Sequence, residues 1–135
     1  MSKSLIYTAN TSTQVLAVDS IISPGTVVRR FGPNLNLSGN AIQIAGAGYY
    51  DIDASFTVSP TAAGDVTITA YLDNVAIQGA TATATAATAG DFITLPIVAA
   101  FREPCQCCEG LSNLTFVLTG TAASVTNSAI VVEKK

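Results

Sequence analysis

Three cysteines within four residues are the most reactive group in the sequence. Cys105, Cys107 and Cys108 lie in the segment Pro-Cys-Gln-Cys-Cys-Glu-Gly, residues 104–110. They could stay free thiols in a reducing cytoplasm, or form a Cys105–Cys108 or inter-subunit disulfide with one cysteine left over. They could also share a soft metal such as Zn²⁺, although no second cysteine pair and no histidine completes a tetrahedral site within one chain. A redox enzyme would place Cys-x-x-Cys at the start of a helix, a context missing here. We expect a structural loop.

Two carboxylates are the next candidates for chemistry. Asp51 and Asp53 are two residues apart, so on a strand they share one face. A glycosidase pair needs one of its carboxyl groups in an apolar pocket, and the neighbouring residues suggest none. We therefore expect a solvated or interfacial strand face at Asp51 and Asp53. The alternative is a structural calcium site at this pair, at Asp65 or at Asp73–Asn74, since their side-chain oxygens suit that ion.

Histidine is absent from the chain. Catalytic Ser–His–Asp and Cys–His arrangements and imidazole metal ligands are therefore excluded. The glycines form no phosphate-binding loop, because none precedes a convincing helix. We expect a protein that is not an enzyme and that carries no cofactor, with a structural metal ion as the one alternative.

Charge is scarce in this sequence. Of its 135 residues, 11% are charged and 49% hydrophobic, with a net charge of −3, whereas an ordinary soluble domain has about 25% charged residues. A small monomer needs a charged surface to stay dispersed, so we expect copies of the same chain to cover part of it. A monomer kept wet by Thr, Ser and Asn is the alternative. The scattered basic residues predict no binding to nucleic acid.

The chain reads as one domain over residues 1–135, with residues 1–13 as a possible attachment segment. The first residues include a lysine but no apolar core of a signal peptide, so we expect synthesis in a cytoplasm without export by that signal. The longest strongly apolar stretch, Phe92 to Phe101, contains Pro96 and is too short for a transmembrane helix. We expect no membrane partner.

Strand signals dominate the elements that would position these groups. Apolar and polar residues alternate from Gly48 to Val58 and again from Val66 to Leu72, as in half-buried strands. Asp73 and Asn74 then predict a tight hairpin turn, because both tolerate left-handed backbone.

Further strands are predicted on both sides of this hairpin. The segment 91–102 is apolar on both faces, which is typical of a strand buried on both sides, one of them by a subunit contact. The other strand candidates are Leu5–Tyr7, Gln14–Ile22, Thr26–Phe31, Asn34–Leu37, Ala41–Ile44, 75–89, 114–118 and 123–133. About ten strands without helices predict an all-β jelly-roll sandwich.

From Ala41 onward the order of features resembles a known family. A short apolar strand is followed by Gly-Tyr-Tyr-Asp-Ile-Asp-Ala-Ser-Phe-Thr-Val (residues 48–58), an Asp-Asn turn, a Val-Ala-Ile-Gln-Gly return, a long apolar strand and Leu-Thr-Phe-Val-Leu. This order resembles the TNF-like trimeric jelly roll of tumour-necrosis-factor ligands and complement globular heads, in its short bacterial and phage version. The resemblance covers about the last ninety residues well and the first forty loosely.

Other segments resemble small proteins of Firmicutes phages and prophages. They are Phe-Gly (residues 31–32), Asn-Leu-Asn-Leu-Ser-Gly-Asn (residues 34–40) and the ending Val-Glu-Lys-Lys. This resemblance implies a structural virion protein, such as a head decoration or fibre protein. It would be made in the cytoplasm of the bacterial host and lie at the virion surface. Its partners would be itself as a homotrimer and other virion proteins. The alternative is a receptor- or carbohydrate-binding module on a phage tail or cell surface.

The resemblance also implies where the trimer contact lies. The family packs residues of one sheet along a three-fold axis. By analogy, the expected interface consists of Tyr49, Tyr71, Phe92, Leu95, Ile97 and Phe101.

Overall fold

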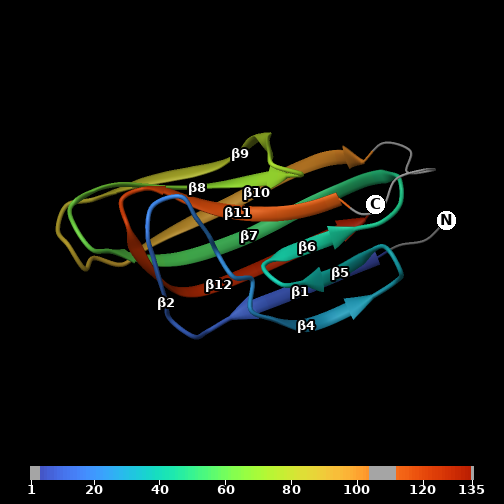
Figure 1. The fold of residues 1–135 in the computed structure, drawn as a ribbon, viewed down its shortest axis with the longest axis horizontal. Coiled ribbons are helices and arrows are strands. Elements are labelled where there is room, and N and C mark those ends of the chain that lie inside the picture. The colour runs from blue at the N-terminus through green and yellow to red at the C-terminus, as the bar shows by residue number, and fades with distance from the viewer. Residues whose placement is uncertain (1–3, 104–111, 135) are drawn as a thin grey trace.

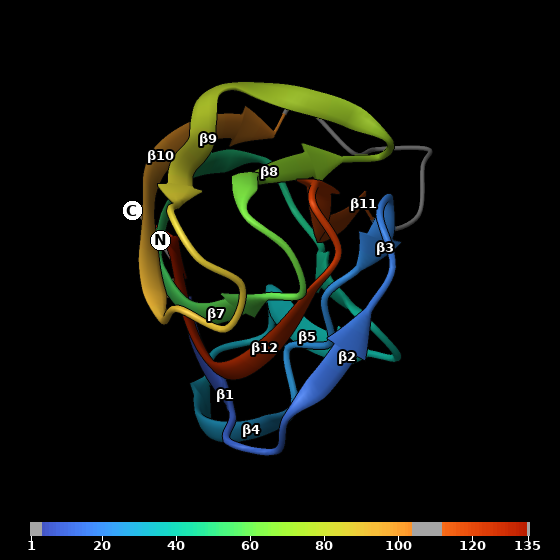
Figure 2. The same ribbon diagram turned by 90° about the vertical axis from the view of Figure 1, so that its left-hand side faces the viewer.

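The chain folds into two antiparallel sheets that pack face to face. The computed structural model describes residues 4–103 and 112–134, which form twelve strands and no helix (Figures 1 and 2). The all-β jelly-roll prediction is confirmed, with twelve strands where the sequence predicted about ten. No helix among the described residues has the length and apolar character needed to span a membrane.

The first sheet contains six strands in the order β10-β7-β12-β1-β4, with β2 beside β12. The second sheet has the order β5-β6-β11-β8-β9, with β3 beside β11. The strand bounds are β1 Ser4–Asn10, β2 Gln14–Leu16, β3 Ser20–Ile21, β4 Thr26–Phe31, β5 Leu35–Ser38, β6 Ala41–Ile44, β7 Gly48–Pro60, β8 Gly64–Leu72, β9 Val75–Ala86, β10 Ile93–Glu103, β11 Ser112–Gly120 and β12 Ala123–Lys134.

Strands from the two ends of the chain meet in the first sheet. β1 pairs with β12 so that Ser4 lies opposite Lys134, and β1 also pairs with β4 (Figure 1). Ile6 on β1 is fully buried in the core. An attachment segment over residues 1–13 would therefore have to accommodate a strand that is built into the sheet from Ser4 to Asn10.

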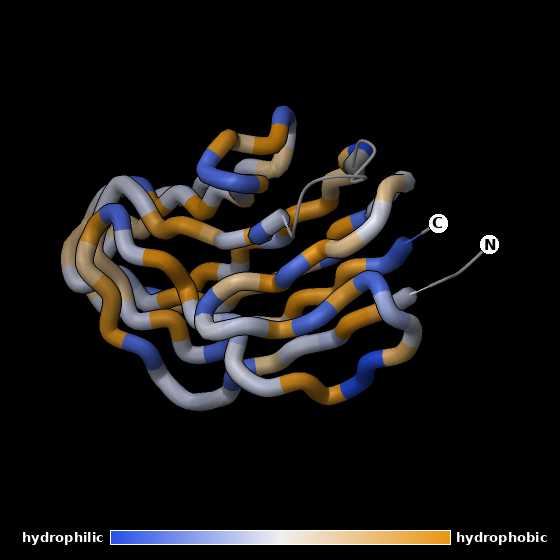
Figure 3. The backbone as a smooth tube through the Cα atoms, turned by 45° about the vertical axis from the view of Figure 1, so that its right-hand side comes forward, coloured by the Kyte–Doolittle hydropathy of each residue, from blue (hydrophilic) through white to orange (hydrophobic). Residues whose placement is uncertain are grey.

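Alternating side chains build the core between the sheets. On β7, Ile52, Ala54, Phe56 and Val58 point inward and are buried, while the residues that alternate with them face outward. The same alternation runs along neighbouring strands as bands of apolar and polar residues (Figure 3). This is the period of two that a sheet buried on one face requires.

Two pairs of aromatic rings lie in this core. Phe56 of the first sheet contacts Phe116 of the second, with ring centroids 5.2 Å apart. Tyr50 stacks on Phe101 across β7 and β10 at 5.4 Å, and the Tyr50 hydroxyl donates to the Gly46 carbonyl at 2.9 Å. Rings at these separations contribute about 0.5–1.5 kcal/mol beyond their buried area. The Phe56–Phe116 pair therefore joins the two sheets directly.

The predicted hairpin between β8 and β9 is confirmed. Leu72 lies opposite Val75, which leaves Asp73 and Asn74 as a two-residue turn. Their φ angles are +51° and +67°, the left-handed values that a type I′ hairpin turn needs at both positions. The side chains of Asp73 and Asn74 therefore lie at the end of the second sheet where β8 turns into β9.

The predicted single strand over Gln14–Ile22 is wrong. β2 pairs with β12 of the first sheet, and β3 pairs with β11 of the second. Between them the chain crosses from one sheet to the other, and Asp19 adopts a φ of +68°. The segment therefore pairs with two different strands, β12 and β11, and does not form one continuous strand.

Two buried hydroxyl groups lack hydrogen-bond partners among the described residues. They are Thr8 Oγ1 on β1 and Ser128 Oγ on β12. We expect Thr8→Val to raise the free energy of unfolding by about 1–2 kcal/mol, because it removes a desolvated polar group and keeps the shape. Urea unfolding at fixed protein concentration measures the change.

Thr67→Val is the matched control for this experiment. The Thr67 hydroxyl lies 2.9 Å from the Thr83 hydroxyl, so its removal should leave stability unchanged or lower it. A loss of stability in Thr8→Val would contradict the prediction.

Candidate functional site

The outward side of the first sheet carries side chains that the core leaves uncovered. One row crosses four strands: Tyr7 on β1 lies opposite Val131 on β12, which lies opposite Asp53 on β7 and then Val98 on β10. The next row consists of Ala9, Ala129, Ser55 and Pro96 in the same order of strands. We call these eight residues the self-association face, after the role that we propose for them below.

Small side chains leave a hollow at the centre of this face. Ala129, Ser55 and Pro96 line a hollow of about 430 Å³, together with Tyr7, Asp53, Ala54 and Val131. A row of small residues lets a second protein surface approach the sheet closely. The shape of the face therefore suits a packed protein contact.

Large apolar residues stand exposed on and around the face. Val98 is 72% exposed, Tyr49 is 61% exposed and Phe31 at the β4 edge is 55% exposed. Contiguous exposed apolar patches on soluble domains mark interaction sites. Arg29 on β4 lies opposite Tyr7, and Arg102 on β10 lies opposite Tyr49. Because β4 and β10 are the two edge strands of the first sheet, these arginines lie at its edges.

Asp51 and Asp53 both project outward from β7, as predicted. Asp53 is exposed and lies between Val98 and Val131, whereas Asp51 is half-buried. No cluster of three or more metal-ligating residues (His, Cys, Asp or Glu) occurs within 4–103 and 112–134. A calcium ion usually takes six to eight oxygen ligands, so a site at this pair would need oxygens beyond these two carboxylates and stays a prediction.

The three cysteines lie outside the described residues. The free-thiol, disulfide and metal interpretations of Cys105, Cys107 and Cys108 therefore stay open predictions.

The structure separates the six residues of the expected interface. Tyr49 and Phe92 are exposed, and Phe92 directly precedes β10. Leu95 and Ile97 are buried in the domain's own core, and Phe101 stacks on Tyr50 there. The inward face of this segment is therefore used within one chain, and its outward face, with Pro96 and Val98, is the one open to a partner.

Tyr71 lies apart from the other five residues of the expected interface. It lies on β8 in the second sheet, opposite Thr115, and alternates with the buried Ala70. Tyr49 belongs to the first sheet. The two tyrosines therefore face opposite sides of the sandwich and do not form one surface.

Comparison with known proteins adds evidence on the fold. No protein-family model matches the chain, and no curated protein matches it in sequence. Its structure is similar to that of Eiger TNF from S. frugiperda, with a TM-score of 0.72 and 13% identity over 98% of this chain and 91% of that one.

Two further solved structures are similar to it. PRD1 vertex protein P5 has a TM-score of 0.63 and 20% identity over 96% of this chain and 94% of that one. The globular domain of zebrafish complement 1qA protein has a TM-score of 0.59 and 6% identity over the same shares. At identities this low, the structural similarity shows a shared fold and nothing about function. The protein therefore has the TNF-like jelly-roll fold that tumour-necrosis-factor ligands and complement globular domains share.

Proposed function

We propose that the protein is a structural component of a phage or prophage virion, where it acts as a homotrimeric surface module. The observation that carries the proposal is the self-association face, an apolar outward surface on a chain with only 11% charged residues. Burying this face against other copies removes apolar area from water at about 25 cal/mol per Å². The chain would work by assembly and not by catalysis.

A three-fold ring suits this surface. In a ring, the contact is heterologous, so one part of this face on one copy meets a different part of the same face on the next copy, and the rotation closes. The sequence resemblance to a trimeric jelly roll supports three copies. The similarity to PRD1 vertex protein P5 supports a place on a virion, as a head decoration or fibre protein.

We expect a native mass three times the 13.8 kDa of one chain. Light scattering coupled to gel filtration at micromolar concentration measures it directly. A monomer mass would exclude the trimer. Mass spectrometry of purified virions from the strain that carries the gene tests the second part, and absence of the chain from those particles would exclude the virion role.

A further inference from the structure

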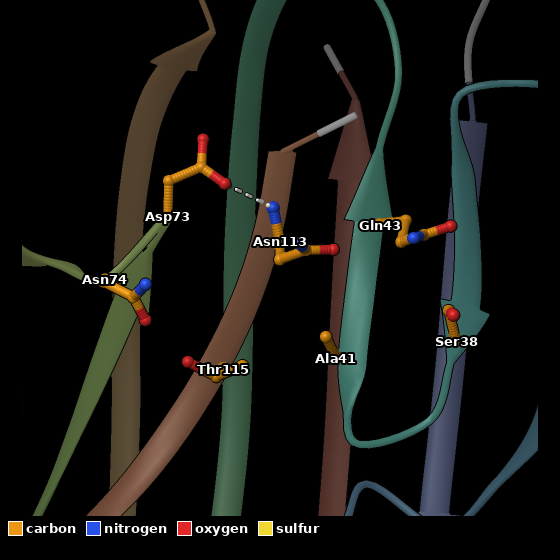
Figure 4. Close-up of a pocket in the computed structure, with 7 residues that line it drawn as sticks. All are labelled: Ser38, Ala41, Gln43, Asp73, Asn74, Asn113 and Thr115. Atoms are coloured by element: carbon orange, nitrogen blue, oxygen red, sulfur yellow. Dashed lines mark hydrogen bonds between the residues drawn. The ribbon is translucent and has the colours of Figure 1, made fainter. Parts of the chain in front are cut away.

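The outward side of the second sheet carries a polar hollow of about 400 Å³. Ala41 and Thr115 lie at its base, from β6 and β11 (Figure 4). Ser38 of β5 closes one side, and Asn74 of the β8–β9 turn closes the other. The hollow belongs to one chain and lies on the opposite side of the sandwich from the self-association face.

The strand register explains why a hollow forms here. Ser38 lies opposite Ala41, and Gln43 lies opposite Asn113. The Ala41 side chain is a single methyl group, shorter than the polar side chains of Ser38, Gln43 and Asn113 that also line the hollow (Figure 4).

The carboxylate at the rim is held in position by the backbone. The Asn113 N–H donates to Asp73 Oδ1 at 2.9 Å, and the Asp73 N–H donates to the Asn113 carbonyl at 2.9 Å (Figure 4). Within the part of the chain that the structure describes, Asp73 Oδ2 and the side-chain amides of Gln43 and Asn74 have no hydrogen-bond partner. These groups are available to a ligand, and the first of them is pre-positioned.

The chemistry of the lining indicates the class of ligand. Side-chain amides and hydroxyls both donate and accept, and one carboxylate accepts. None of the described residues that line the hollow is a lysine or an arginine, so an anionic ligand would meet only the negative charge of Asp73 among them. Tyr71 lies opposite Thr115 on the same outward face, where its ring can cover the apolar side of a sugar.

We propose that this hollow binds a neutral oligosaccharide. Ligand hydroxyls donate to Asp73 and exchange hydrogen bonds with the amides of Gln43 and Asn113. A polar row of Asn36, Gln43, Asn113 and Asp73 crosses β5, β6, β11 and the turn after β8. Three strand spacings give the row a length of about 14 Å, which suits an extended sugar chain.

A panel of neutral and acidic oligosaccharides, immobilised on an array, tests the proposal. We expect neutral members to bind, and calorimetric titration with the strongest of them gives its affinity. Gln43→Ala should weaken that affinity about tenfold, the effect of one lost hydrogen bond of about 1.4 kcal/mol. Ala41→Leu should abolish binding by filling the base, although it removes no polar group. Gln78→Ala, an exposed amide on β9, is the matched control and should leave the affinity unchanged.

Several outcomes would overturn the proposal. They are binding of acidic members alone, binding of no member, unchanged affinity in Ala41→Leu, or loss of binding on chelation of divalent cations, which would indicate a cation site. Because the hollow lies within one chain, sugar binding should persist in the Val98→Asp variant even if that variant is monomeric. Failure of the trimer and failure of the sugar site are therefore separate results.

Discussion

Val98→Asp should convert the proposed trimer to a monomer at micromolar concentration. Val98 is 72% exposed in the single domain, so the change should alter the stability of the fold by at most about 0.5 kcal/mol. In the trimer, each new carboxylate would be buried in an apolar contact next to Asp53, its register neighbour, and would cost several kcal/mol per copy. Since about 1.4 kcal/mol is a factor of ten, the association constant should fall more than a thousandfold.

Val75→Asp is the matched control. Val75 is 69% exposed and lies on the second sheet, so the same chemical change there should leave the mass of the trimer unchanged. Light scattering of the wild type and both variants across a dilution series measures the effect. A trimeric Val98→Asp, or dissociation by Val75→Asp alone, would show that the subunits meet through another surface.

Phe116→Ala should destabilise the domain by about 3–5 kcal/mol, the usual cost of removing a buried phenylalanine ring. Phe116 is 2% exposed, and its ring contacts Phe56 across the sandwich. The variant loses apolar burial and an aromatic contact and leaves a cavity between the sheets. Small domains are stable by about 5–15 kcal/mol, so the variant should unfold at a much lower urea concentration.

This measurement is cleanest in the Val98→Asp background, where unfolding should not be coupled to dissociation. Phe92→Ala is its control, because Phe92 is 71% exposed in the domain and its removal should change stability little. Equal losses in the two variants would contradict the assignment of Phe116 to the core.

The sequence predicted the middle of the fold better than its beginning. β7 and β8 alternate strictly over several residues, and the turn at Asp73 and Asn74 follows from the left-handed backbone that both residues tolerate. The segment 14–22 gave no comparable signal. Its division into β2 and β3 depends on which distant strand each half meets, and the sequence of nine residues does not contain that information.

The sequence also could not show which residues of the expected interface lie on the surface of the domain. The alternation of residues along a strand shows which of them share a face, but it does not show which face packs in the interior of the domain. In β10, Leu95 and Ile97 are as apolar as an interface residue would be, and the partner sheet covers them. The polar hollow was missed because Ser38, Ala41 and Asn113 come together only through pairing of β5, β6 and β11.

The pairing of β1 with β12 has a consequence for biosynthesis. β12 lies between β1 and β7, so β1, which also pairs with β4, and β7, which also pairs with β10, each lack one native neighbour until β12 is made. A chain still on the ribosome would hold two unpaired strand edges of the kind that promote aggregation. Contacts between such distant segments also make folding slow, on the millisecond-to-second scale of β-sandwiches. The first sheet therefore closes only after translation has passed Lys134, and the proposed contact between subunits can form only after that.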